Sequence, residues 1–253
     1  RSPAFSYRYY FQNLISLPEI FQFFHLIIFR FSVAVFNLLN FHPVFYSLII
    51  AAAGMVVVPF IPSTLRATVN LLFVLIIAFL TSLSAINVLM GNPLEIIING
   101  TPFFGEIPLR IDALSSWFIL IVNLTCINGA LYGIGYMRPY SENVKDIPGR
   151  SANLSLHWIS FIAFQTSMLW VCILQHGLAF LVAWEIMSLS SLLLLLFEHQ
   201  RKDTLKAGVN YLVQMHLAVV FLSIAFIRVY FSEGSFDFNM IASFFYHHPS
   251  GWL

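Results

Sequence analysis

The chain has 253 residues, of which 59% are hydrophobic and 9% are charged, and its formal net charge is +1. Soluble globular domains usually carry about a quarter charged residues, so this composition leaves too little polar surface for a water-soluble fold of this size. The sequence has no dense basic patch, which argues against a nucleic-acid-binding domain. The composition therefore favours a fold that is solvated by lipid.

Residues 1–42 are apolar and aromatic but carry scattered polar side chains. The stretch 21–41, with His25 and Arg30, is compatible with a poor seventh span or with an aromatic helix lying in the membrane interface, and its polar residues favour the interfacial helix. The first residue is Arg1 rather than Met. The segment also lacks the ordered regions of a signal peptide, so we expect a fragment or a processed product.

Six later stretches are apolar over about 20 residues, the length that crosses a hydrocarbon core at 1.5 Å per residue. They lie near residues 43–62, 66–90, 113–137, 155–175, 177–197 and 207–231. The sequence therefore predicts an all-α, polytopic bundle with a six-helix membrane domain over 43–231. Residues 232–253 are predicted to form an extracytoplasmic tail or a link to a next span.

The segment between the second and third spans, GNPLEIIINGTPFFGEIPLRI, has short β-prone pieces around Asn99-Gly100. This pattern predicts a hairpin-like loop over the membrane at residues 91–111. Asp112 opens the third span, where a carboxylate suits the positive end of the helix dipole. We therefore predict that Asp112 caps this helix.

The basic residues predict the orientation, because cytoplasmic loops are enriched in lysine and arginine. Alternating the six spans places seven of them on one side: Arg66, Arg138, Lys145, Arg150, Arg201, Lys202 and Lys206. Only Arg110 and Arg228 fall on the other side of these spans. The sequence therefore predicts a multi-pass protein of the cell inner (cytoplasmic) membrane with its hairpin loop outside.

Neither the cysteines nor the histidines form a recognisable cofactor site. Cys126 and Cys172 lie far apart in apolar segments, without a CxxC pair or a disulfide framework. A transmembrane haem needs facing axial ligands at depth, whereas His157 and His176 lie near span ends and only His216 is deep. We expect no cofactor on this chain, so iron–sulfur or nickel chemistry would lie on another polypeptide.

Glu185, in the stretch FLVAWEIMSLSSLLLLLFEHQ, is the main candidate for proton transfer. It lies eight residues beyond Gly177, which places it about 12 Å into the bilayer. A carboxylate in lipid costs about 2.5–3.5 kcal/mol on insertion scales, so it needs a partner or a hydrated cavity. The alternative is a protonated Glu185 that only joins helices by hydrogen bonds. Ser188, Ser190 and Ser191 either support a water file or allow close helix packing.

His216 is the second candidate, about 15 Å beyond Lys206 and near the midplane. An imidazole suits a proton relay, although a neutral, structural histidine is an equal alternative. Lys206, Asn210 and Gln214 recur every four residues and predict a polar stripe, which makes Lys206 a further proton-transfer candidate. His216 lies off this stripe, so the two features are expected to face different neighbours.

Three separated stretches resemble one known family: PLRIDALSSWFILIVNLTCINGALYGIGYM at 108–137, AFLVAWEIMSLSSLLLLLFEH at 179–199 and AGVNYLVQMHLAVVFLSIAF at 207–226. They look like the antiporter-like proton-translocating membrane subunits shared by respiratory complex I, Mrp antiporters and membrane-bound hydrogenases. The WE-M-LSS pattern, the following FEH and the later GSFDF are most similar to the N-terminal part of the hydrogenase-4 and formate hydrogenlyase large membrane subunit.

The resemblance implies that Glu185 pairs with a lysine on a further helix. His216 matches a histidine typical of the hydrogenase branch, although Met215 and Ala218 stand where the family often has Thr and Gly. Members of the family are much longer and carry the lysine, a second half-channel and a lateral helix on later segments. We therefore expect this chain to be the N-terminal portion of a longer subunit.

The implied function is proton translocation in a hydrogenase-4, formate hydrogenlyase or complex-I-like redox complex, by a subunit that is not itself catalytic. Its implied partners are other membrane subunits, a peripheral redox arm and the lipid bilayer. Two alternatives remain open: an Mrp-type cation/proton antiporter subunit, and a membrane scaffold that transports nothing.

Overall fold

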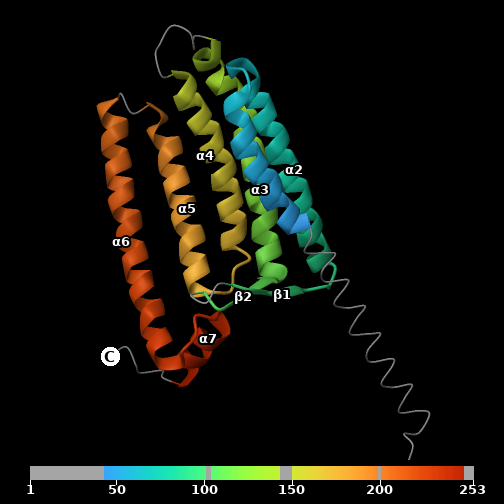
Figure 1. Ribbon diagram of the computed structural model, residues 1–253, viewed down its shortest axis with the longest axis vertical. Coiled ribbons are helices and arrows are strands. Elements are labelled where there is room, and N and C mark those ends of the chain that lie inside the picture. The colour runs from blue at the N-terminus through green and yellow to red at the C-terminus, as the bar shows by residue number, and fades with distance from the viewer. Residues whose placement is uncertain (1–42, 101–103, 143–149, 199–200, 248–253) are drawn as a thin grey trace, which may run out of the picture. The chain divides into compact units, whose positions relative to one another are not determined.

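The computed structural model describes residues 43–100, 104–142, 150–198 and 201–247 (Figure 1). The interfacial helix that the sequence suggests within residues 1–42 lies outside this part of the chain.

The described chain contains six helices that are long and apolar enough to cross a membrane. In order they are a helix over 43–57 that continues into the 3-10 turn η1 (Val58–Phe60), α2 (Ser63–Leu89), α3 (Ala113–Glu142), α4 (Arg150–Val171), α5 (Gly177–Leu195) and α6 (Lys202–Glu233). A 3-10 turn, η3 (Leu196–Glu198), follows α5. The predicted all-α, multi-pass bundle is confirmed.

Among the helix boundaries that differ from the prediction, two have a clear physical reason. α6 begins at Lys202, five residues before the apolar run that was used to predict it. Its first turn includes Asp203, which the helix dipole favours there. α4 ends at Val171 rather than near residue 175, because residues 173–175 instead pair with a strand.

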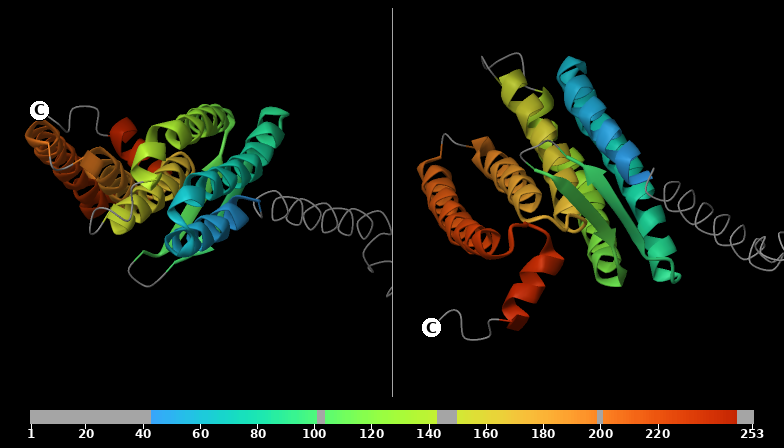
Figure 2. Two further views of the ribbon diagram at one scale, coloured as in Figure 1. Left: turned by 90° about the horizontal axis from the view of Figure 1, so that it is seen from above. Right: turned by 60° about the horizontal axis from the view of Figure 1, so that its bottom comes forward.

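The helices alternate in direction and lie side by side (Figure 1). We call the end at which α2, α4 and α6 begin the basic end, and the opposite end the hairpin end. α4 lies between α5 and the α2–α3 pair, and α6 packs on α5 at the edge of the bundle (Figure 2). This order places the α5–α6 interface farthest from the first helix.

The predicted hairpin is present. β1 (Leu94–Asn99) pairs antiparallel with β2 (Glu106–Ile111). Asn99 and Gly100 lie where the turn begins rather than at its centre. The Gly100 N–H donates to the Gly105 carbonyl at 2.8 Å, and Gly105 adopts φ +67°, which favours glycine.

The hairpin is joined to the connection between α4 and α5. The Arg110 N–H donates to the Ile173 carbonyl at 2.9 Å, and the Gln175 N–H donates to the Pro108 carbonyl at 3.0 Å. Leu109 lies between these bonds and is buried. The hairpin therefore fixes the point at which α5 starts.

A short helix, α7 (Phe238–His247), lies within the segment that the sequence analysis described as a tail or link. Gly234 ends α6 in the left-handed conformation, with φ 69°, and lets the chain turn back. The Gly177 N–H then donates to the Phe236 carbonyl at 2.8 Å, and the Phe238 N–H to the Gln175 carbonyl at 3.0 Å. These bonds hold the start of α7 against the start of α5 (Figure 2).

The buried core lies mainly among the first helix, α2, α3, α4 and the hairpin. Trp158 of α4 is its largest fully buried side chain. A Cβ added to Gly133 of α3 would lie 3.1 Å from the Trp158 ring, so a glycine here lets the ring approach α3 closely.

Arg66 joins three segments at the basic end. Its guanidinium donates to the carbonyls of Ile61 at 2.8 Å, Pro59 at 3.1 Å and Ser151 at 2.8 Å. Only 6% of this side chain is exposed. In the sequence Arg66 was one of the basic residues of the predicted cytoplasmic side, and the structure shows that it also links η1, α2 and α4.

Candidate proton-transfer site

α5 begins at a histidine cap that sets the depth of Glu185. His176 is extended, and its Nδ1 accepts a hydrogen bond from the Ala179 N–H at 3.3 Å. Burial lowers the pKa of His176, while a hydrogen bond to the backbone of Phe104 and the charge of Asp237 act in the opposite direction. Glu185 follows eight residues after Gly177, so helical rise places it about 12 Å from this end.

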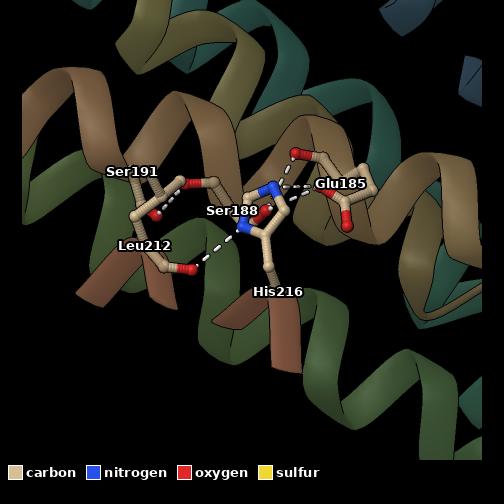
Figure 3. Close-up of polar contacts among 5 residues, drawn as sticks. All are labelled: Glu185, Ser188, Ser191, Leu212 and His216. Atoms are coloured by element: carbon tan, nitrogen blue, oxygen red, sulfur yellow. Dashed lines mark hydrogen bonds and ion pairs between the residues drawn. The ribbon is translucent and has the colours of Figure 1, made fainter. Parts of the chain in front are cut away.

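Glu185 faces His216 of α6 (Figure 3). The Glu185 Oε2 atom lies 3.7 Å from the His216 Nε2 atom. The Ser188 hydroxyl donates to the Glu185 carbonyl at 3.0 Å and lies 3.4 Å from Oε2. The structure thus brings together two candidates, Glu185 and His216, that the sequence predicted separately.

The hydrogen bond of His216 Nδ1 determines whether Nε2 can share a proton with Glu185. His216 Nδ1 lies 2.9 Å from the Leu212 carbonyl, which can only accept, so Nδ1 carries a hydrogen. In a neutral imidazole Nε2 is then the lone-pair nitrogen and faces the carboxyl. One proton can therefore lie on Glu185 or on Nε2, giving either a neutral pair or an ion pair.

A hydroxyl ladder continues from this pair toward the basic end. The Ser191 hydroxyl donates to the Ser188 carbonyl at 2.8 Å and lies 2.5 Å from the Tyr211 hydroxyl. Ser188 is buried, whereas Ser191 and Tyr211 are half-buried. Tyr211 was not singled out from the sequence, because its role depends on the packing of α6 against α5.

The pair lies at an open edge of the bundle. The side chains of Glu185 and His216 are 31% and 47% exposed. The neighbouring Trp184 ring lies tilted against Phe180, with ring centroids 5.6 Å apart, and its buried Nε1–H has no partner among the described residues. The arrangement can hold and exchange a proton, and one side of it remains accessible to another group.

Lys206 does not join this site. It is exposed and lies ten residues, about 15 Å, from His216 along α6. Asn210 and Gln214 are exposed with it. Helical spacing places Lys206 and Asn210 on the side of α6 opposite to the buried Gly208. The three side chains of the predicted stripe are therefore exposed, and Lys206 lies apart from the Glu185–His216 pair.

The remaining predicted residues have structural environments. Asp112 caps α3 through a hydrogen bond from the Ser115 N–H at 2.8 Å, which lowers the pKa of the carboxyl. His157 borders a cavity of about 250 Å³ between α4 and α5 at the basic end. Cys126 is buried and Cys172 half-buried, and both are free. Burial raises the pKa of the Cys172 thiol.

Across the described ranges, no group of three histidine, cysteine or acidic side chains is arranged to hold a metal ion. The site described here contains one carboxylate, one imidazole and hydroxyl groups. These groups suit proton exchange rather than metal binding.

Residues 175–253 match the transmembrane family described as NADH:quinone oxidoreductase/Mrp antiporter. This segment begins just before α5 and includes Glu185, His216 and α7. The match therefore covers the candidate site as a whole.

Two relatives extend the comparison. The chain is 33% identical over 138 residues to hydrogenase-4 component B of Escherichia coli K12, a match that covers 54% of this chain and 19% of the relative. It is 27% identical over 148 residues to an uncharacterised protein of Mycobacterium tuberculosis H37Rv, covering 58% of this chain and 21% of that protein. The matches thus span about a fifth of the length of these relatives.

The fold is similar to that of a solved chain in the membrane-bound sulfane sulfur reductase, an archaeal respiratory membrane complex. The TM-score is 0.61 at 18% identity, over 79% of this chain and 38% of that chain. This likeness concerns the arrangement of helices. The resemblance predicted from the sequence is confirmed, because residues 175–253 match the NADH:quinone oxidoreductase/Mrp antiporter transmembrane family and the chain is similar to hydrogenase-4 component B.

Proposed function

We propose that this chain is the N-terminal portion of a proton-translocating membrane subunit in a redox complex of the hydrogenase-4, formate hydrogenlyase or complex I type. In this proposal Glu185 and His216 exchange a proton near the middle of the membrane. The 3.7 Å contact between Glu185 Oε2 and His216 Nε2 is the observation that carries the proposal.

The contact between Glu185 Oε2 and His216 Nε2 is too long, at 3.7 Å, for a direct hydrogen bond. Hydrogen bonds between nitrogen and oxygen measure about 2.7–3.2 Å, so the two groups must approach by about 0.5–1 Å, or a water must bridge them. A small movement of α6 along α5 therefore opens or closes the transfer step. Such a step can be coupled to a change elsewhere in an assembly.

The serine and tyrosine hydroxyls supply a route on the basic side of the pair. Ser188 contacts Glu185, and Ser191 contacts Tyr211 one turn farther along. Hydroxyl groups both donate and accept, so a few waters between them could pass a proton to the basic end. By the positive-inside bias, this end would face the cytoplasm of an inner membrane.

The resemblance to longer family members suggests what covers the exposed side of the pair. A further helix would bring a lysine close to Glu185, and its charge would favour the ionised carboxylate. A change of state in the redox arm would move that charge and release the proton. The partners of this chain would then be the other membrane subunits and the redox arm.

The proposal is tested with Glu185→Gln in the intact complex that contains this chain, reconstituted into vesicles. The substitution keeps the shape of the side chain but removes its proton, so proton uptake should fall by about a hundredfold while the complex still assembles. His216→Gln should also lower transport. The matched control is Glu95→Gln on the hairpin, where the carboxylate is 68% exposed and pairs with Arg110.

Two other results would favour the alternative functions. If Glu185→Gln alters assembly and leaves proton movement unchanged, the chain is a scaffold and the proposal fails. If the chain co-purifies with small antiporter subunits and transport requires sodium without a redox partner, an Mrp-type antiporter replaces the redox complex.

A further inference from the structure

The interface of α2, α3 and α4 contains buried polar atoms that lack hydrogen-bond partners among the described residues. They belong to Asn70 (Nδ2 and Oδ1), Gln165 (Oε1), Asn123 (Oδ1) and Ser116 (Oγ). None of these four side chains is more than 3% exposed. We call this set the buried amide column.

The members of the column meet on one face of α2. The Gln165 Nε2 atom donates to the Val74 carbonyl at 3.4 Å, and the Asn123 Nδ2 atom donates to the Ala78 carbonyl at 3.2 Å. Val74 and Ala78 are one helical turn apart, and Asn70 lies one turn before Val74. Amides from α4 and α3 therefore reach the same stripe of α2 at successive levels.

Ser116 extends the column toward the hairpin end. It lies seven residues from Asn123, so it shares that face of α3 about 10 Å farther along. Both side chains are buried against the neighbouring helices. The unpaired atoms thus follow the interface through much of the bundle.

Arg66 lies at the other end of the same stripe, one turn before Asn70. Its guanidinium is fixed by the three backbone carbonyls of Pro59, Ile61 and Ser151. A fixed positive charge at the end of a polar channel raises a barrier to cations and protons. A proton moving along this stripe of α2 toward the basic end would therefore meet that charge.

We propose that this interface binds a file of water molecules. The waters donate to the free oxygens of Gln165 and Asn123 and satisfy both atoms of the Asn70 amide. Buried polar groups almost always have partners, and internal waters commonly provide them where several polar atoms converge. These waters hold α3 and α4 in register on α2. The charge of the Arg66 guanidinium prevents protons from passing along them to the basic end.

Radiolytic hydroxyl footprinting of the protein in lipid nanodiscs tests this proposal, because a bound water produces the radical beside its neighbours. Cys126 is the reporter, since it is 4% exposed, lies three residues from Asn123 and packs against Val74. Ile173, which is 0% exposed in the apolar core, is the dry control. Each oxidation rate is divided by the rate of the same residue in the unfolded protein.

We expect Cys126 to be oxidised about fivefold faster than Ile173 on this scale, because water lies beside it. Gln165→Leu nearly keeps the side-chain volume but removes the amide, and it should reduce the oxidation of Cys126. Gln214→Leu on the exposed face of α6 should change nothing. Equal rates at Cys126 and Ile173 in the unsubstituted protein would show a dry interface and overturn the proposal.

Proton transport provides a separate test of the closed end. Gln165→Leu in the intact complex should transport protons at the rate of the unsubstituted protein. A loss of transport would show that the column conducts protons, which contradicts the blocking role of Arg66. This outcome is distinct from failure of the Glu185 proposal, because Glu185 remains in place in this variant.

Discussion

The α2–α3 interface and the α5–α6 interface both hold polar side chains between two helices, but they bury these side chains to different extents. Asn123 and Thr81 between α2 and α3 are 3% and 1% exposed. Glu185 and His216 between α5 and α6 are 31% and 47% exposed. Each helix has a most apolar stretch of 18 residues. In α6, 6% of that stretch is buried within the protein, whereas in α2 39% is buried.

This difference separates polar groups that hold helices together from groups that can exchange protons. Asn123 donates to the Ala78 carbonyl and to two hydroxyls of α2, so its amide hydrogens are committed to the fold. Glu185 has contacts at 3.4 and 3.7 Å, which are too long to commit its proton. A group that carries protons needs such weak contacts, because strong hydrogen bonds would stabilise one protonation state and oppose release of the proton.

The largest expected effect is a loss of folding stability when Arg66, at the basic end of α2, is replaced. Arg66→Met removes charged hydrogen bonds to the backbone carbonyls of three half-buried residues, Pro59, Ile61 and Ser151. The free energy of unfolding should fall by about 3 kcal/mol or more, because hydrogen bonds to charged groups contribute about 1.5–3 kcal/mol each. Steric trapping in a lipid bilayer measures this change in the free energy of unfolding.

Arg138→Met is the matched control for Arg66→Met. Arg138 also lies at the basic end, but its ion pair with Glu142 is exposed, with the two side chains 75% and 55% accessible. Exposed pairs contribute about 0–1 kcal/mol. Similar losses in the two variants would contradict the structural role assigned to Arg66.

A second pair of variants compares the two interfaces directly. Asn123→Ala removes an amide whose two hydrogens are shared among three acceptors of α2, whereas Ser191→Ala removes one interhelical contact to Tyr211. Each interhelical hydrogen bond in a membrane contributes about 0.6 kcal/mol on average, so we expect losses of about 1.2 and about 0.6 kcal/mol. Steric trapping again measures both losses. A larger loss for Ser191→Ala than for Asn123→Ala would contradict the division between polar groups that join helices and groups that exchange protons.

A third effect on stability concerns His176, which caps α5 where the hairpin meets this helix. Burial lowers the pKa of His176, so the folded state binds fewer protons than the unfolded state. Its contribution is full above the ordinary histidine pKa of about 6.5 and is lost as pH falls through the lower folded value. Protonated Nδ1 can no longer accept from the Ala179 N–H, and a lost cap costs about 1 kcal/mol.

Unfolding measured between about pH 7.5 and pH 5 tests this effect. His176→Asn keeps an N-cap that does not titrate, so its stability should vary less over this range. If the asparagine variant has the same pH dependence as the unsubstituted chain, the effect belongs to another group.

Composition and apolar length were sufficient to predict the six spans, because a helix in lipid must be long and apolar wherever its neighbours lie. The hairpin and the Asp112 cap were also predicted, since turn and cap residues act within a few positions of the chain. α7 was missed because ten residues are too short to be recognised as a span, and its place depends on bonds to the distant Gln175 and Gly177.

The sequence by itself identified Glu185 and His216 as separate candidates, since a titratable side chain deep in an apolar run is recognisable from one segment. Only the tertiary structure decided that the two face each other and that Lys206 does not join them. It also decided that Arg66, counted with the basic loops, lies buried among carbonyls. These outcomes depend on how one helix is rotated against another, and helical periodicity fixes a face without fixing which neighbour that face meets.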